Sequence, residues 1–264
     1  MVKVGLLGFG KAGRAVAEVL LNESSVSLEW VYKKSKSEFQ SVKDYSGICC
    51  EDPAYIFSEK QIDIEKLISS FPVDVIVDFS NSSAIFTYAD SVKSRNISLI
   101  SAISSYPDKC LVVLKEISKR TRVIYSPNIT LGINFLLLMS KMLKSIAPDA
   151  DIEIIEEHFS LKKEVSGTAK VLARSLQLPA SQIKTIRAGG IVGVHEVLFG
   201  FPYQTIRLRH EAISKEAFGN GIVFAIHHLP KSTHGFFPCK TFLNPCSSSI
   251  LMKCWLAPEF SFHC

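Results

Sequence analysis

Residues 2–21 read VKVGLLGFGKAGRAVAEVLL and fall into three parts. Residues 2–7 are a mostly apolar run that predicts a buried strand, and residues 12–21 have the periodicity of a helix. The glycines between them follow the pattern GxGxxG, in which the first permits a tight turn, the second lets the backbone approach a pyrophosphate and the third allows close packing. Because free N–H groups at a helix N-terminus attract phosphates, we predict a dinucleotide site here, with a purely structural turn as the alternative. Its residues are Gly8, Gly10, Lys11, Ala12 and Gly13.

The same strand and helix alternation continues to residue 125. Apolar runs predict strands at 27–32, 73–79, 97–100 and 122–125, and helical patterns lie at 82–94 and 109–119. Strands that alternate with helices at this spacing form a parallel sheet covered on both faces. We therefore predict an α/β fold with a doubly wound parallel sheet of the Rossmann type. Residues 38–59 show no clear period and predict a loop-rich stretch.

The end of the second strand bears on the choice of cofactor. Sites that prefer NAD usually place an acidic residue there to hold the ribose hydroxyls. This chain has Lys33 and Lys34 instead, and two cations suit a 2′-phosphate better. We predict that NADPH is used at least as well as NADH; two solvated lysines on a loop are the alternative.

A change of character after Pro127 predicts a second unit with a mixed sheet. An apolar helix at 131–146 precedes a nearly alternating strand at 151–159 and a helix that begins near Ser166. Strands follow at 191–199 and 203–210, with a turn over 200–202 and a helical pattern at 216–229.

Composition excludes several classes of protein. The net charge of +5 is spread along the 264 residues, which does not indicate nucleic-acid binding. The longest later apolar run, 133–139, is too short to span a membrane, and no signal peptide is recognised. Seven scattered cysteines predict free thiols in a cytoplasmic protein, and without a CxxC or HxxxH pair we predict no metal site.

The segment DIEIIEEHFSLKKEVSGTAK, residues 151–170, carries the clearest chemistry. His158 and Lys162 are four residues apart, so on a strand they face the same side. Ser166, Gly167 and Thr168 resemble a helix start, where backbone N–H groups favour a carboxylate.

This segment resembles the substrate segment of the 4-hydroxy-tetrahydrodipicolinate (dihydrodipicolinate) reductase family, approximately ExHHxxKxDAPSGTA. Three further blocks are similar to that family in the same order: SPNITLGIN at 126–134, RAGGIVGVHEVLFG at 187–200 and IRLRHEAISKEAFGNG at 206–221. The resemblance covers residues 2 to about 245.

The resemblance implies an oxidoreductase of lysine and diaminopimelate biosynthesis that uses NAD(P)H to reduce 4-hydroxy-tetrahydrodipicolinate, a small cyclic dicarboxylate. His158 would be the general acid, and Lys162 would assist it and hold a carboxylate. The implied substrate-binding residues are Phe159, Lys162, Ser166, Gly167 and Thr168, and the cofactor-binding residues are Gly8, Gly10, Lys11, Ala12, Gly13, Lys33, Lys34, Phe79, Ser101, Ile103, Ser126 and Asn128.

The resemblance also implies the domain organisation. The nucleotide domain would comprise residues 1–127 and 216–264, and residues 128–215 would form an α+β substrate domain through whose sheet the chain assembles into a homotetramer.

Several positions depart from the family pattern. Phe159 replaces a second histidine, the following loop is one residue shorter, and residues 101–104 read SAIS where the family has GTTG. Lys215 stands where an arginine is expected. These departures keep two alternatives open: a degenerate nucleotide-binding sensor or scaffold without turnover, and another two-domain dehydrogenase of small acids, such as an aspartate or homoserine type.

Other polar residues in the matched blocks have simpler interpretations. For His195 and His210 we expect structural hydrogen bonding rather than catalysis. Asp78 is expected to order the loop that follows its strand.

Overall fold

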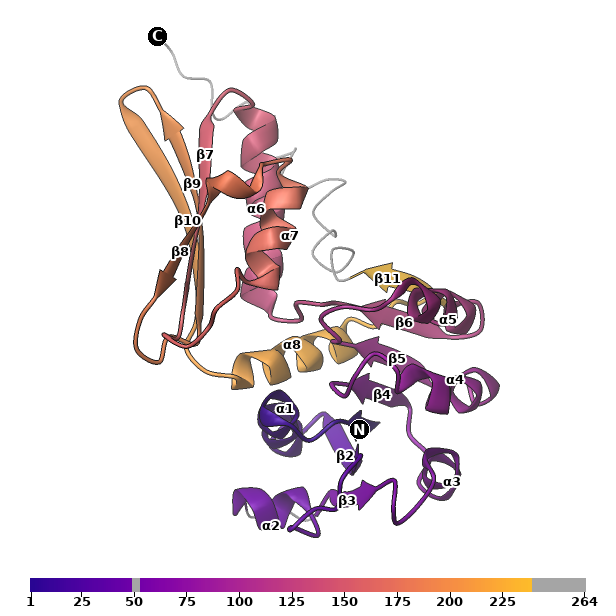
Figure 1. Ribbon diagram of the computed structural model, residues 1–264. Helices are drawn as coiled ribbons and strands as arrows, with labels where there is room; N and C mark the ends of the chain where they lie inside the picture. Colours follow the sequence, from indigo (N-terminus) through magenta and orange to yellow (C-terminus); the bar gives the residue numbers. More distant parts are fainter. Residues whose placement is uncertain (49–52, 239–264) are drawn as a thin grey trace.

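Two sheets organise the protein in a computed structural model that describes residues 1–48 and 53–238 (Figure 1). Interpretations that concern residues 49–52 and 239–264, among them most of the cysteines, lie outside the described residues. Within the described part of the chain, no helix is long and apolar enough to cross a membrane.

The larger sheet has seven parallel strands in the order β11-β6-β5-β4-β1-β2-β3. The order reverses between β1 and β4, which is the topological switch point where doubly wound folds bind ligands. The prediction of a doubly wound parallel sheet is confirmed. The strands are β1 (Val2–Leu7), β2 (Val26–Lys33), β3 (Tyr55–Ser58), β4 (Val75–Asp78), β5 (Ser98–Ser101), β6 (Arg122–Tyr125) and β11 (Gly235–Pro238).

Helices cover both faces of this sheet, as its fully buried strands require. On one face α1 (Lys11–Leu21) and α8 (Glu216–His227) pack through residues such as Val16 and Ile222. The other face is covered by α3 (Ile64–Ser70), α4 (Ile85–Ser94) and α5 (Asp108–Ser118). All four residues of β4 are buried, which explains why its sequence is apolar without alternation.

The smaller sheet is mixed, with the order β10-β9-β7-β8, as expected from its sequence. Its central strand β7 pairs antiparallel with β9 and parallel with β8. Figure 1 shows α6 and α7 side by side on one face of this sheet. Alternate residues of β7 are buried beneath these helices. The elements are α6 (Leu131–Ile146), β7 (Asp151–His158), α7 (Gly167–Ser175), a 3-10 turn (Ala180–Gln182), β8 (Ile183–Arg187), β9 (Gly193–Phe201) and β10 (Gln204–Ala212).

After β10 the chain returns to the larger sheet. Helix α8 packs closely on α1 and on the segment that joins β6 to α6, because Gly219 and Gly221 have no side chains. A Cβ atom at Gly221 would lie 2.0 Å from the carbonyl oxygen of Ile129. Strand β11 then pairs in parallel with β6. Helix α8 therefore connects the two halves of the molecule.

Several local expectations differ from the structure. The stretch 38–59 contains α2 (Val42–Ser46) and β3, and the strand at 235–238 was not foreseen. The turn expected over 200–202 is formed by Pro202 and Tyr203 alone, because β9 extends to Phe201; Tyr203 takes a φ of 67° there. The missed elements, which also include α3 and β8, have only four to seven residues, too few to show a period.

Candidate active site

A cavity of about 340 Å³ opens at the carboxyl ends of β1, β2 and β4, at the switch point of the sheet. Five of the predicted cofactor-binding residues line it, together with Tyr32, Ser80 and Glu59. The cavity lies where a doubly wound sheet holds a nucleotide. The five are Gly8, Gly10, Lys33, Lys34 and Phe79.

The glycine turn in this cavity fits a dinucleotide. Gly8 has a φ of +96°, and a Cβ atom there would lie 2.6 Å from the carbonyl oxygen of Phe79. A Cβ atom at Gly10 would meet nothing within 4 Å, so the backbone is open to a close approach. Lys11, Ala12 and Gly13 begin α1, and no side chain caps that helix start. Their N–H groups are thus suited to phosphate oxygens.

The remaining predicted cofactor residues lie at the ends of β5 and β6, outside this cavity. Ser101 is fully buried, and its Oγ lies 2.9 Å from the hydroxyl of Tyr106. Ile103 is also buried. Ser126 donates to the carbonyl oxygen of Asn128 over 2.8 Å, which fixes the start of the segment between β6 and α6.

Asp78 orders the loop after β4, as predicted. Its Oδ1 accepts from the backbone N–H of Ser80 at 2.9 Å, and its Oδ2 accepts from the hydroxyl of Tyr88 at 2.6 Å. Burial raises the pKa of this carboxyl. Asp78 therefore fixes the loop whose residues Phe79 and Ser80 line the nucleotide cavity.

Asn128 joins the larger sheet to the start of α7. Its Nδ2 donates to the Thr168 hydroxyl over 2.6 Å, and its carbonyl oxygen accepts from Nδ2 of Asn134, also at 2.6 Å. Asn128 and Thr168 share the wall of a second cavity of about 250 Å³, which has largely apolar sides. The structure thus brings together two predicted site residues that are 40 positions apart.

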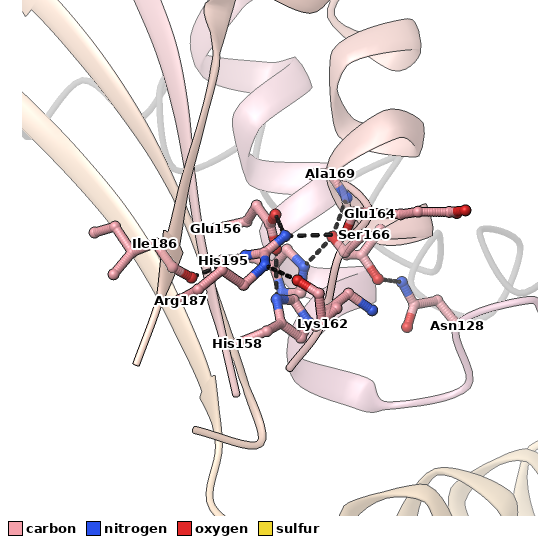
Figure 2. Close-up of polar contacts among 11 residues, drawn as sticks. Asn128, Glu156, His158, Lys162, Glu164, Ser166, Ala169, Ile186, Arg187 and His195 are labelled. Carbon is pink, nitrogen blue, oxygen red and sulfur yellow. Dashed lines mark hydrogen bonds and ion pairs between the residues drawn. The ribbon is translucent and has the colours of Figure 1, made fainter. Parts of the chain in front are cut away.

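His158 and Glu156 lie on the buried face of β7 at its carboxyl end (Figure 2). The Glu156 carboxylate is fully buried and touches Nδ1 of His158 through Oε2. Burial lowers the pKa of His158, the charges of Lys162 and Arg187 lower it further, and Glu156 opposes them. His158 is therefore an ionisable group tuned by one anion and two cations.

Lys162 comes close to His158, but not for the reason inferred from the sequence. Strand β7 ends at His158, and Lys162 lies in a turn in which its N–H donates to the carbonyl oxygen of Phe159 at 3.0 Å. The expectation that a shared strand face unites the pair is wrong. The turn brings Lys162 back towards His158, whose pKa it affects.

Arg187 holds this turn in place. It lies opposite His158 on the neighbouring strand β8. Its Nε donates to the carbonyl oxygen of Lys162 at 2.7 Å, and its Nη2 donates to that of Glu164 at 2.9 Å and to Oε1 of Glu156 at 2.5 Å. The guanidinium connects the buried carboxylate to the loop that carries Lys162.

Ser166 caps the start of α7, as predicted. Its Oγ accepts from the N–H of Ala169 at 3.0 Å and lies 2.9 Å from Nε2 of His195 on β9. Burial, above all, lowers the pKa of His195 to about 3, so this ring is neutral near pH 7. His195 therefore has the structural hydrogen bond expected of it. Gly167 and Thr168 form the first turn of α7.

His210 also belongs to this region. It pairs with His195 across β9 and β10 and packs against Gly132, where a Cβ atom would lie 2.2 Å from its Cδ2. Its Nδ1 is buried without a hydrogen-bond partner among the described residues. The expected hydrogen bond is therefore not found at this nitrogen.

The charges of the site suit an anion better than a metal ion. Ligand atoms of Glu156, His158 and His195 lie within 4.8 Å of one another. However, Glu156 is engaged by Arg187, and the positive charge of Lys162 acts on the same histidines. Two cations beside a helix start favour carboxylates.

Glu156 and Arg187 were not assigned a role from the sequence. A signal was present for Glu156, because residues two apart on a strand share a face and His158 follows it at that spacing. Arg187 required knowledge of the pairing between β7 and β8. Phe159, a predicted substrate contact, is 43% exposed at the end of β7.

Comparisons with known proteins agree with this geometry. The family models for the N-terminus and the C-terminus of dihydrodipicolinate reductase match residues 2–129 and 132–243. The 4-hydroxy-tetrahydrodipicolinate reductase of Thermosipho africanus is 33% identical over 184 residues, which cover 69% of this chain and 84% of the relative. That of Clostridium perfringens strain ATCC 13124 is 30% identical over 83% of this chain and 94% of its own length.

A solved structure shares the fold. The dipicolinate-bound dihydrodipicolinate reductase from Paenisporosarcina sp. TG-14 superposes with a TM-score of 0.72 at 19% identity, over 91% of this chain and 99% of its own. Both halves of the sequence match the models for one family, in chain order. The chain therefore belongs to the dihydrodipicolinate reductase family, as its motifs indicated.

Proposed function

We propose that the chain reduces 4-hydroxy-tetrahydrodipicolinate to tetrahydrodipicolinate with NAD(P)H, a step of lysine and diaminopimelate biosynthesis. One hydride and one proton enter per turnover, and one water leaves. The observation that carries the proposal is the convergence of His158, Lys162 and the start of α7 beside Asn128, at the junction of the two sheets (Figure 2). This arrangement offers a proton donor, a cation and a carboxylate site together.

The chain's own residues have distinct parts in this proposal. When bound, the nicotinamide nucleotide supplies the hydride. His158 gives a proton to the ring of the substrate. Lys162 holds one carboxylate by its charge, and Ser166, Gly167 and Thr168 hold the other through the helix start and the threonine hydroxyl. Phe159 lies beside the substrate without a hydrogen bond to offer.

The nucleotide is held at the carboxyl ends of the parallel strands. Gly8, Gly10 and the first residues of α1 hold the phosphates, and Phe79, Ser101, Ile103, Ser126 and Asn128 lie towards the nicotinamide. Lys33 and Lys34 favour the 2′-phosphate of NADPH. Glu59 lines the same cavity and suits a ribose hydroxyl, which leaves room for NADH.

The proposal is tested by a coupled assay. A synthase supplies the unstable substrate, and the fall in nicotinamide absorbance is followed for the wild type and for His158→Gln. We expect the variant to lose roughly 10²- to 10⁴-fold in kcat while it keeps its fold and its affinity for the nucleotide. His234→Gln, an exposed histidine bonded to its neighbour Thr233, is the control. Near-normal turnover of His158→Gln would show that another group is the acid.

A wild-type protein that binds NADPH but shows no turnover would instead support a sensor or scaffold. The substitution at Phe159 and the packed side chains of Ser101 and Ile103 are the features that motivate this second candidate. The same assay therefore separates the two functions.

The proposal includes the domain division at 127/128 and 215/216 and assembly into a homotetramer. The edge strand β10 supports an interface on the smaller sheet, since it is nine residues long and mostly exposed, with Ile206 37% exposed. Sedimentation of the purified chain measures the oligomeric state.

A further inference from the structure

Glu156 is a buried charge with two specific partners. Its side chain has no exposed surface, and its two carboxylate oxygens face different groups: Oε1 accepts from Arg187 at 2.5 Å, and Oε2 touches Nδ1 of His158. A carboxylate removed from water is costly unless it is paired. Glu156 is paired on both oxygens, and the pairing puts its carboxylate beside the ring of His158, where it can orient that ring.

The contact with Glu156 distinguishes the two nitrogens of the His158 ring. Nδ1 faces the carboxylate, which favours the neutral tautomer that carries the proton on Nδ1. Nε2 lies on the other side, 3.3 Å from where a Cβ atom of Gly193 would be. Nε2 is therefore the nitrogen that can exchange a proton with a bound molecule, and glycine at position 193 leaves space beside it.

Arg187 extends this arrangement to the loop. One guanidinium bonds the carboxylate of Glu156 and the carbonyl oxygens of Lys162 and Glu164. A planar group with several donors is needed for this, since an ammonium group cannot reproduce the fork. The same side chain thus fixes the anion beside the proton donor and the backbone that carries Lys162.

We propose that Glu156 and Arg187 are positioning residues of the reaction: Glu156 directs Nε2 of His158 towards the substrate, and Arg187 ties Glu156 to the loop that carries Lys162. This inference rests on the proposed function for its catalytic meaning. The groups that face His158 are Glu156 on β7, Lys162 in the loop, Arg187 on β8 and His195 on β9.

The first experiment uses Glu156→Gln in the full chain. Nitrogen-15 NMR of the imidazoles measures the tautomer and pKa of His158 without any substrate. We expect the pKa of His158 to fall, because Glu156 raises it in the wild type, and the preference for Nδ1–H to weaken. In the coupled assay kcat should fall roughly tenfold to a hundredfold with a small change in KM, since a misplaced donor slows the proton transfer itself.

A matched control is available on the same two strands. Glu153 on β7 pairs with Lys184 on β8 at 3.3 Å and does not touch His158. Glu153→Gln should leave the His158 spectrum and kcat unchanged. If Glu156→Gln behaves like this control, the proposal is overturned.

Arg187→Lys tests the proposed role of Arg187. Because it keeps the positive charge, it can also test the proposal if Glu156→Gln does not fold. Dipicolinate, pyridine-2,6-dicarboxylate, is the binding probe. We expect its Kd and the substrate KM to rise roughly tenfold, because lysine cannot make the several hydrogen bonds by which Arg187 holds the loop. Lys184→Gln should change neither value. An unchanged Kd and KM in folded Arg187→Lys would refute the proposal that Arg187 holds the loop that carries Lys162.

Failure of the proposed function has a different signature. In that case the wild type has no turnover, yet NMR still reports whether Glu156 orients His158. Turnover in the wild type combined with an unaffected His158 in Glu156→Gln would count against the positioning role alone.

Discussion

Replacing Ser166 with alanine should lower the free energy of unfolding by about 2–4 kcal/mol. The Ser166 hydroxyl caps α7 through the N–H of Ala169, and losing an N-cap of this kind costs about 1 kcal/mol. The same oxygen is the partner of Nε2 in His195, and a buried polar group left without a partner costs about 1–3 kcal/mol more. Both serine and histidine are nearly inaccessible, so water cannot readily replace the lost bond.

Ser41→Ala provides the matched comparison. Ser41 is equally buried and caps α2 by accepting from the N–H of Asp44 at 3.1 Å. No histidine in the described part of the chain bonds its hydroxyl, so we expect a loss of about 1 kcal/mol. Urea unfolding at pH 7.5, followed by circular dichroism, gives both values. Equal losses in the two variants would refute the claim that the Ser166 to His195 bond stabilises the fold.

Three further predictions concern protonation, cofactor and substrate. Between pH 6.5 and about 3 the unfolded chain binds a proton at His195 that the folded chain does not, so stability falls as the pH falls, by about 1.4 kcal/mol per pH unit from this group. His195→Gln should flatten that part of the profile in urea unfolding; an unchanged slope would contradict the low pKa. Replacing Lys33 and Lys34 with glutamine should raise the KM for NADPH more than for NADH, and the difference should shrink in high salt. Steady-state kinetics with both cofactors decides this. An equal effect on both KM values would show that the lysines do not bind the 2′-phosphate. Phe159→His adds a donor beside the site and should tighten dipicolinate binding by about fivefold, the value of one hydrogen bond of about 1 kcal/mol. Calorimetry measures this, and unchanged affinity would show that residue 159 does not reach the ligand.

The parts of the fold that were predicted correctly are those with long local patterns. The unit of β1, the glycine turn and α1 is specified within 20 residues, and the 16-residue helix α6 was predicted with its observed bounds. Short elements such as α2 and β3 have stability that comes from tertiary contacts, for example Val42 and Ile56 in the shared core. A local pattern carries little information about them.

The site divides in the same way. The cap at Ser166 was readable because a serine before a helix forms bonds within three residues. The pairing of Glu156 with Arg187 depends on which strands are neighbours. The local pattern of a single sequence does not predict that β8 pairs with β7. The match to a family motif assigned Lys162 to the site, while the turn after β7 that brings it near His158 came from the structure.

The charge balance of the site links its two groups of residues to the substrate. Glu156 carries one negative charge, and Lys162 and Arg187 carry two positive charges, so the site has one net positive charge while His158 is neutral. Burial and the two cations disfavour protonation of His158 in this state. A dicarboxylate that binds beside Lys162 and the start of α7 brings two negative charges, which oppose the effect of the cations and favour the protonated ring. If the proposed function holds, we expect the substrate to raise the pKa of His158, so that the proposed proton donor is charged mainly when there is a molecule to receive the proton.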